Sequence, residues 1–280
     1  MIKDILVHVP TERPVRPVLD ASISLAAAFT AHLHAVAIGY VSPSTAYVMD
    51  GSAGTAVAAA LEMEEERATQ RASAALAVFE TEARNAGIAY DQRAMEGVPA
   101  DVAASIGVTA RLYDLTVVLQ PEAERETFDN KIPVEILFQA GGPVLFVPHI
   151  FSGALKARRI GICWDGSRLA ARALRDARPF LSQADTLVAL SINGANSLPA
   201  DASAEELAKH LRRVGLPIKL IDLPASRAEI QPSILSLAAD ENLDMLVMGA
   251  YGRSRLQEGF LGGVTREMLV TMTVPTLMSH

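Results

Sequence analysis

The stretch Leu243–Thr265 reads LDMLVMGAYGRSRLQEGFLGGVT and joins a short apolar run to a glycine-rich basic loop and a helix start. The run at 243–248 is almost wholly apolar, as expected of a strand covered on both faces of a sheet. The glycines after that strand include Gly249 and Gly252, and Gly262 and Gly263 directly before the helix. A helix start offers free N–H groups and the positive end of the helix dipole, and glycines let a ligand approach the backbone. The pattern predicts a phosphate-binding loop after a buried strand.

Length and composition favour a soluble protein of two domains. The chain has 280 residues, and domains average about 150 residues, so we expect one domain at 1–150 and another at 156–280. Half of the residues are apolar, but no apolar run approaches the roughly 18 residues that span a bilayer. Residues 1–7 are typical of a strand rather than a signal peptide. We therefore expect a cytoplasmic protein without a membrane partner.

Charge and cysteine content exclude further classes. A formal net charge of −7 disfavours a nucleic-acid partner, because phosphate neutralisation requires clustered Lys and Arg. The single cysteine, Cys163, excludes an intrachain disulfide and a cysteine-cluster metal site. We expect Cys163 to be a small apolar residue of a buried strand.

The two halves share an order of predicted elements although few residues are identical. In the first half, these are strands at 5–9, 34–40, 112–118 and 143–149 with helices at 18–30 and 55–86. In the second half, they are strands at 159–164, 186–192, 243–248 and 275–280 with helices at 170–181 and 202–214. Alternating strands and helices favour a parallel, doubly wound sheet in each half. Ligands bind such sheets beyond the carboxyl ends of the strands, where the winding reverses. There Asp165, which follows the first strand of the second half, would meet the glycine loop.

We therefore predict an α/β fold with two doubly wound, parallel, five-stranded sheets. The fifth strand of each half would lie at an edge, and an apolar edge strand needs a partner. The obvious partner is the matching strand of the other half, so the halves are expected to pack together as an intramolecular pseudo-dimer.

The spacing Gly249-x-x-Gly252, nine residues and then Gly262 with a small residue after it resembles the ATP-binding signature of the universal stress protein family. The sequence Asp165-Gly166-Ser167, which follows the first predicted strand of the second half, agrees with that resemblance. The order of elements resembles the tandem form of the family over the whole chain, whereas the motif resembles it only in the second half. The resemblance implies a Rossmann-like, adenine nucleotide alpha hydrolase-like fold. It also implies binding of ATP, with magnesium left open, by a nucleotide-dependent regulatory or protective protein of the stress response.

The resemblance assigns roles to individual residues. Asp165 would lie near the ribose and adenine, and a backbone group of Ser191 near the adenine. The positions implied at the phosphates and the helix start are Gly249, Gly252, Arg253, Gly262, Gly263, Val264 and Thr265. Family members that bind nucleotide usually carry Ser or Thr where this chain has Gly263. The missing hydrogen bond is worth about 0.5 to 1.5 kcal/mol, or roughly tenfold in affinity, and Thr265 is available to compensate.

The first half departs from the signature. Residues 118–124, VLQPEAE, contain no glycine where the loop should start, and the first strand ends in VPTE rather than in Asp. A turn before the last strand explains Gly141 and Gly142. We expect this degenerate half to bind no ATP and to serve as a dimerisation partner or to hold another ligand.

The sequence gives less support to other kinds of functional site. The chain has neither a P-loop nor a nucleophile elbow. His32 and His34 share one face of a strand, as zinc ligands sometimes do, but no third ligand is evident nearby. Trp164 is expected to stack on a base or to pack in the core.

No paired acid and base accompanies the motif, so we expect no catalytic residue and at most weak ATPase activity. The alternatives are a slow ATPase, in which Asp165 holds a metal or water, and a nucleotide-free scaffold that acts through protein contacts. Assembly of two chains into a homodimer is left open.

Overall fold

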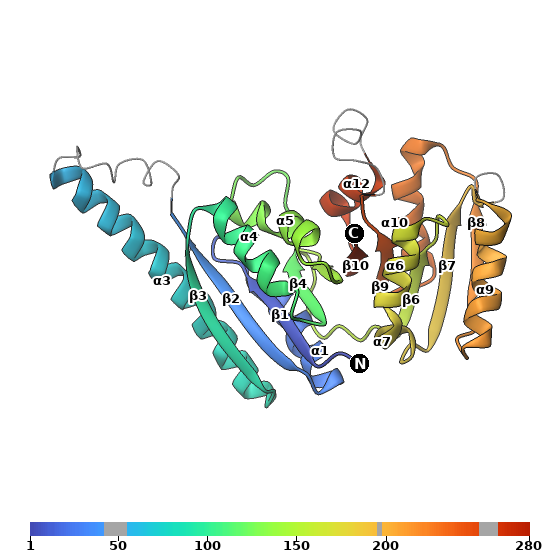
Figure 1. The fold of residues 1–280 in the computed structure, drawn as a ribbon, viewed down its shortest axis with the longest axis horizontal. Helices are drawn as coiled ribbons and strands as arrows, with labels where there is room; N and C mark the ends of the chain where they lie inside the picture. Colours follow the sequence, from blue (N-terminus) through green and yellow to red (C-terminus); the bar gives the residue numbers. More distant parts are fainter. Residues whose placement is uncertain (42–54, 195–197, 252–262) are drawn as a thin grey trace.

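All strands of the computed structural model belong to one sheet, which is covered by helices on both faces (Figure 1). The structure describes residues 1–41, 55–194, 198–251 and 263–280. The strands are β1 (Asp4–Val9), β2 (His32–Tyr40), β3 (Tyr90–Gly97), β4 (Leu115–Leu119), β5 (Val144–Val147), β6 (Arg159–Cys163), β7 (Thr186–Ile192), β8 (Lys219–Leu223), β9 (Met245–Gly249) and β10 (Thr276–Ser279).

The helices connect successive strands in each half. They are α1 (Arg16–Phe29), α3 (Thr55–Ala86), α4 (Pro99–Ala110), α5 (Ile132–Gln139), α6 (Arg168–Asp176), α7 (Arg178–Leu181), α9 (Ala204–Arg213), α10 (Ile230–Asp240) and α12 (Val264–Thr271). Short 3-10 helices are η1 (Phe128–Asn130), η2 (Ala200–Ala202) and η3 (Arg227–Glu229). In the described ranges no helix is both long enough and apolar enough to cross a membrane.

The strand order is β3-β2-β1-β4-β5-β10-β9-β6-β7-β8. Within each half the neighbouring strands are parallel, and the chain winds outward in two directions from the pair β1 and β4, or β6 and β9. The predicted pair of doubly wound, five-stranded sheets is therefore confirmed. Strands β5 and β10 pair antiparallel, with Leu145 opposite Leu277. This pairing covers both apolar edges, as expected, and joins the halves into one ten-stranded sheet.

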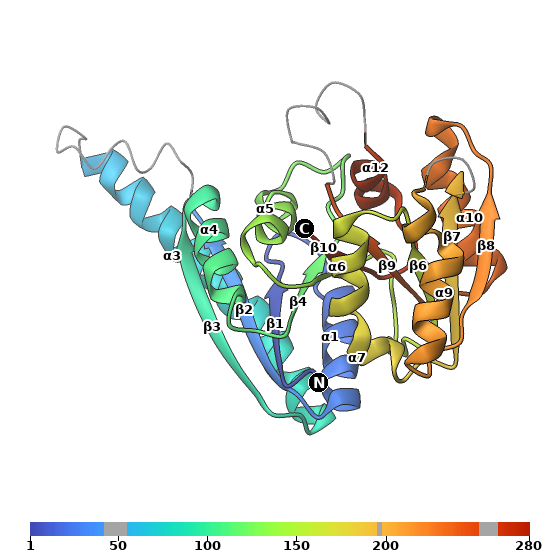
Figure 2. The same cartoon turned by 45° about the vertical axis from the view of Figure 1, so that its right-hand side comes forward.

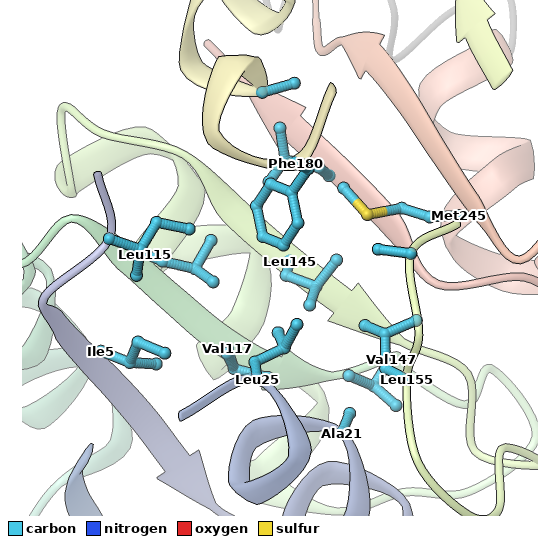
Figure 3. Close-up of a cluster of buried hydrophobic side chains, with 14 of the residues drawn as sticks. Ile5, Ala21, Leu25, Leu115, Val117, Leu145, Val147, Leu155, Phe180 and Met245 are labelled. Atoms are coloured by element: carbon cyan, nitrogen blue, oxygen red, sulfur yellow. The ribbon is translucent and has the colours of Figure 1, made fainter. Parts of the chain in front are cut away.

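The two halves also share their hydrophobic core. Helices α1, α3, α6, α7 and α9 cover one face of the sheet, and α4, α5, α10 and α12 cover the other. On the first face the rings of Phe29 and Phe180, one from each half, meet edge to face with centroids 5.2 Å apart. Figure 3 shows Phe180 beside Leu145 and Leu25 in the same apolar cluster. The expectation that the halves pack together is confirmed.

The connection between the halves is held against α1. The Gly153 N–H donates to the Asp20 carboxylate at 3.0 Å, and the Leu155 N–H donates to the Ser24 hydroxyl oxygen at 3.0 Å. Leu155 itself is buried. Two hydrogen bonds and a buried side chain therefore fix this connection.

One prediction of local structure needs correction, and one strand in each half was not located from the sequence. The single helix expected at 170–181 is two helices, α6 and α7, because Pro179 lacks the N–H that a continuous helix requires at that position. The third strands, β3 and β8, could not be placed from apolar runs, because β3 is mostly polar and β8 is a short strand with charged residues at 219 and 222. Both are largely exposed edge strands. In Figure 2 they form the two outer edges of the sheet.

Candidate functional site

A cavity of about 560 Å³ lies at the carboxyl ends of β6, β7 and β9, beneath the starts of α10 and α12. Strands β6 and β9 are the neighbours from which the second half winds in opposite directions. This is the place where open α/β sheets bind ligands. The cavity therefore lies at the position expected from the alternation of strands and helices.

The structure brings together five of the nine residues predicted for the site. Lining this cavity are Asp165, Gly249, Gly263, Val264 and Thr265. Gly252, Arg253 and Gly262 lie outside the described residues. Ser191 is described but does not line the cavity, since its neighbours Leu190 and Ile192 face that way and side chains alternate along a strand.

The Ser191 side chain is buried on the opposite face of the sheet. Its hydroxyl lies where a side chain on Gly194 would be placed, with the added Cβ only 2.1 Å away. Any contact of Ser191 with a ligand would thus use its backbone, as the resemblance implies.

A turn after β6 holds Asp165 at the rim of the cavity. The Asp165 carboxylate accepts the Ser167 N–H at 3.0 Å, and Gly166 takes the left-handed conformation with φ of 67°. Ser167 then caps α6, since its hydroxyl oxygen accepts the Ala170 N–H at 3.1 Å. The sequence Asp165-Gly166-Ser167 thus forms a turn and a helix cap and leaves the Asp165 side chain exposed at the rim.

Gly249 has a structural reason to be glycine. A Cβ on Gly249 would lie 2.6 Å from the Ala170 nitrogen and 2.6 Å from the Leu169 carbonyl carbon. The first turn of α6 therefore packs directly on the end of β9. Gly249 sets the distance between two walls of the cavity, which the glycine pattern alone did not reveal.

Helix α12 begins at the cavity, and its N-cap residue has no side chain with which to cap it. Its N-cap residue, Gly263, has φ of −119° and ψ of 147°, which is extended backbone that any residue can adopt. The hydroxyl oxygen of Thr265 accepts the Tyr251 N–H at 3.1 Å. Thr265 is thus engaged in fixing the chain after β9, whereas the N-cap position offers no hydroxyl.

Trp164 and Cys163 lie in the cavity wall. Trp164 is 9% exposed, and its indole N–H donates to the Ala202 carbonyl at 2.9 Å. Core packing therefore accounts for Trp164, although one side of it borders the cavity. Burial, and secondly the nearby Asp165 carboxylate, raise the pKa of the Cys163 thiol to about 12. The thiol is protonated at neutral pH and is a poor nucleophile.

Sequence reasoning missed the opposite wall and a cation. The apolar wall comprises Leu190, Ile192, Ile230, Ile234 and Met248. Arg227 is exposed on η3 and also lines the cavity. The signal that could have located it is the capping box of Ser226 and Glu229, which marks a helix start. Among the described lining residues, Asp165 is the only carboxylate and Arg227 the only cation.

The comparisons with known proteins agree with this geometry. The model of the universal stress protein family matches residues 156–280. These residues form a universal stress protein domain. A universal stress protein of Methanocaldococcus jannaschii is 32% identical over 74 residues, which cover 26% of this chain and 44% of that protein. The match therefore spans less than half of that relative.

Solved structures show that the fold extends over the whole chain. A universal stress protein from Archaeoglobus fulgidus superposes with a TM-score of 0.73 at 15% identity, covering 98% of this chain and 95% of its own. A provisionally named universal stress protein from Pseudomonas aeruginosa gives a TM-score of 0.59 at 15% identity, with 99% and 93% covered. At these identities the likeness shows the fold alone.

In the first half, side chains of the chain itself engage the backbone donors that follow β1. The Asp129 carboxylate, 2% exposed, accepts the N–H groups of Thr11 and Glu12 at 3.0 and 2.8 Å. It also accepts the Tyr40 hydroxyl at 2.8 Å. A carboxylate from η1 thus satisfies the backbone donors that follow β1.

Arg13 fills the neighbouring space. Its guanidinium donates to the Gln120 carbonyl after β4 and to the Asn130 side chain, and it forms an ion pair with Glu122 at 3.3 Å. The Arg13 side chain is fully buried. Nearby, burial lowers the pKa of His8, which therefore stays neutral near pH 7. The Asp129 carboxylate and the Arg13 guanidinium are thus both engaged by groups of the chain itself.

The histidine pair considered as a zinc site has a different partner. His34 contacts the Asp91 carboxylate of the neighbouring strand β3, and His32 lies 3.6 Å from the same carboxylate. Asp91 is more than half exposed. The pair thus forms a surface contact between two strands.

Proposed function

We propose that the chain is a tandem universal stress protein that binds one ATP in the domain at 156–280 and acts in the stress response as a nucleotide-dependent regulatory or protective protein. The observation that carries this proposal is the cavity between β6 and β9, where Asp165, Gly249 and the start of α12 meet. Its volume of about 560 Å³ lies within the range of roughly 300 to 1,000 Å³ that is typical of small-molecule sites.

The walls of the cavity match the parts of an adenine nucleotide. The flat, largely apolar base fits the wall built around Ile192, Ile234 and Met248. Asp165 at the rim is suited to accept ribose hydroxyls. The start of α12, whose N-cap residue is Gly263, and the Arg227 guanidinium would supply N–H donors and positive charge for phosphates. A magnesium ion would depend chiefly on the phosphates and water, because Asp165 is the only carboxylate among the described lining residues.

The domain at 1–150 is proposed to be a degenerate universal stress protein domain that binds no ATP. Asp129 occupies the backbone donors after β1, and Arg13 is held by Glu122 and Gln120. An incoming phosphate would have to displace a buried carboxylate from these donors. The pairing of β5 with β10 supports a role as the partner half of the pseudo-dimer.

Titration with ATP, ADP and AMP tests this function. We expect calorimetry to show binding, and the fluorescence of Trp164 to change in parallel. The chain contains one tryptophan, and it borders the cavity, so the optical signal reports on this site. The absence of both heat and a shift in the thermal unfolding midpoint at millimolar nucleotide would overturn nucleotide binding and leave the scaffold function.

Replacement of Gly263 by serine is expected to tighten ATP binding by up to about tenfold, because it adds one hydroxyl hydrogen bond near the phosphates. The extended backbone of Gly263 accepts a serine without strain. Serine and glycine are both good N-cap residues, so we expect little change in stability. Calorimetry of the wild type and Gly263→Ser gives the ratio of affinities, with Gly263→Ala as the control that adds a side chain without a hydroxyl. Equal affinity of the Ser and Ala variants would contradict a phosphate contact at this position.

A further inference from the structure

An aromatic cluster connects the first half to the residue from which the glycine loop starts. Phe138 lies on α5 of the first half, and its ring centroid is 4.8 Å from that of Tyr251, at an interplanar angle of 42°. The Phe138 ring also meets the His280 ring edge to face, with centroids 4.7 Å apart. All three side chains are half-buried. One residue of the first half thus contacts both chain segments that continue from β9 and β10.

Tyr251 has a backbone conformation that its surroundings must maintain. Its φ of 54° is in the left-handed region, which is disfavoured for residues with a side chain. Its N–H donates to the hydroxyl oxygen of Thr265, and Thr265 lines the cavity at the start of α12. The conformation of Tyr251 therefore sets one contact between the chain after β9 and α12.

His280 holds the backbone at Ala250, next to Tyr251. Its Nδ1 lies 3.0 Å from the Ala250 carbonyl oxygen, which can only accept, so Nδ1 is the donor. The Ala250 N–H in turn donates to the Ser279 carbonyl at 2.9 Å. The backbone on the amino side of Tyr251 is thus tied to β10, and the Tyr251 side chain is held by Phe138.

We propose that Phe138 is a positioning residue for the nucleotide site of the other half: its ring holds Tyr251, and through the Tyr251 N–H it positions the Thr265 hydroxyl at the start of α12. This inference rests on the proposed function. It gives the degenerate half a definite contribution to the site, since α5 supplies the ring that holds Tyr251.

Nucleotide affinity of Phe138 variants tests the proposal. Loss of an aromatic pair corresponds to about a threefold to tenfold change in an equilibrium constant, so we expect Phe138→Ala to weaken ATP binding by that factor. Phe138→Tyr keeps the ring and should bind ATP as the wild type does. Titration of full-length protein followed by Trp164 fluorescence measures both.

Tyr90→Ala is the matched control, because Tyr90 also forms a half-buried aromatic pair, with Phe79 at 5.6 Å, but at the far edge of the first half. We expect it to lower the unfolding midpoint without changing ATP affinity. If Phe138→Ala does not fold, Phe138→Leu keeps apolar volume without the ring and should weaken binding in the same direction.

The outcomes separate this inference from the proposed function. Wild-type protein that binds ATP while Phe138→Ala, or Phe138→Leu in its place, binds it equally well would overturn the role of Phe138 and leave the proposed function intact. The same holds if Tyr90→Ala weakens binding as much as Phe138→Ala does. Wild-type protein that binds no ATP would overturn the proposed function itself.

Discussion

Replacement of Asp129 by alanine is expected to lower the free energy of unfolding by about 3 to 5 kcal/mol, the cost of removing one partner from a buried, hydrogen-bonded charge. The Asp129 carboxylate is 2% exposed and accepts three hydrogen bonds, from Thr11, Glu12 and Tyr40. Alanine would leave all three donors without this acceptor. Each buried donor left without a partner costs about 1 to 3 kcal/mol, so the loss should rank among the largest for a single polar residue of the chain.

Urea unfolding of the purified protein measures this loss, and Asp91→Ala provides the matched control. Asp91 also accepts contacts from a neighbouring strand, but its side chain is more than half exposed, so its removal should cost less than about 1 kcal/mol. Similar midpoints for both variants would show that the groups around Asp129 do not depend on it. ATP binding in the other half should persist in Asp129→Ala wherever that variant remains folded.

Replacement of Gly249 by alanine is expected to weaken ATP binding at least tenfold and to lower the free energy of unfolding by about 1 to 3 kcal/mol, the typical cost of overpacking. The added Cβ would lie 2.6 Å from backbone atoms of Leu169 and Ala170, so the first turn of α6 must move. That turn follows Asp165 and Ser167, which line the cavity. Gly249→Ala therefore displaces one wall of the site.

The control for this variant is Gly142→Ala, because the nearest atom to a Cβ at Gly142 is the Tyr113 carbonyl oxygen, 3.9 Å away. Calorimetry and urea unfolding on both variants measure affinity and stability. We expect Gly142→Ala to retain wild-type affinity. Wild-type affinity in Gly249→Ala would mean that the contact between β9 and α6 does not shape the site.

The arrangement of the sheet could be predicted because apolar strand runs are a strong signal. Residues 243–248 and 144–147 lie near the centre of the sheet, where both faces are buried and the sequence is almost continuously apolar. The expectation that the fifth strand of each half needs a partner also predicted the pairing of β5 with β10. Strands β3 and β8 gave no such signal, since both are largely exposed and charged residues interrupt them.

The sequence predicted only part of the candidate site, because only some of its residues belong to a motif. Asp165 and Gly249 belong to a recognisable motif, and the sheet topology brings them to one cavity. Arg227 and the apolar wall come from elements that carry no motif, so only the fold shows that they line the cavity. The reason for Gly249 is equally invisible in the sequence, because it depends on how closely α6 packs on β9.

The first half illustrates what the absence of a motif leaves open. The missing glycines at 118–124 predicted the loss of a phosphate loop, but not what replaces it. The replacement consists of Asp129 and Arg13, which are far apart in sequence and converge with Tyr40 and Glu122. Such a network depends on tertiary contacts between distant segments.

The central claim is one adenine nucleotide per chain, held at the junction of β6 and β9. Native mass spectrometry of the full chain titrated with ATP and magnesium tests it most directly, because it counts bound nucleotides. We expect saturation at one nucleotide per chain, with occupancy strongly reduced in Gly249→Ala and retained in Gly142→Ala. Saturation at two nucleotides per chain, or no bound nucleotide at millimolar ATP, would contradict the claim.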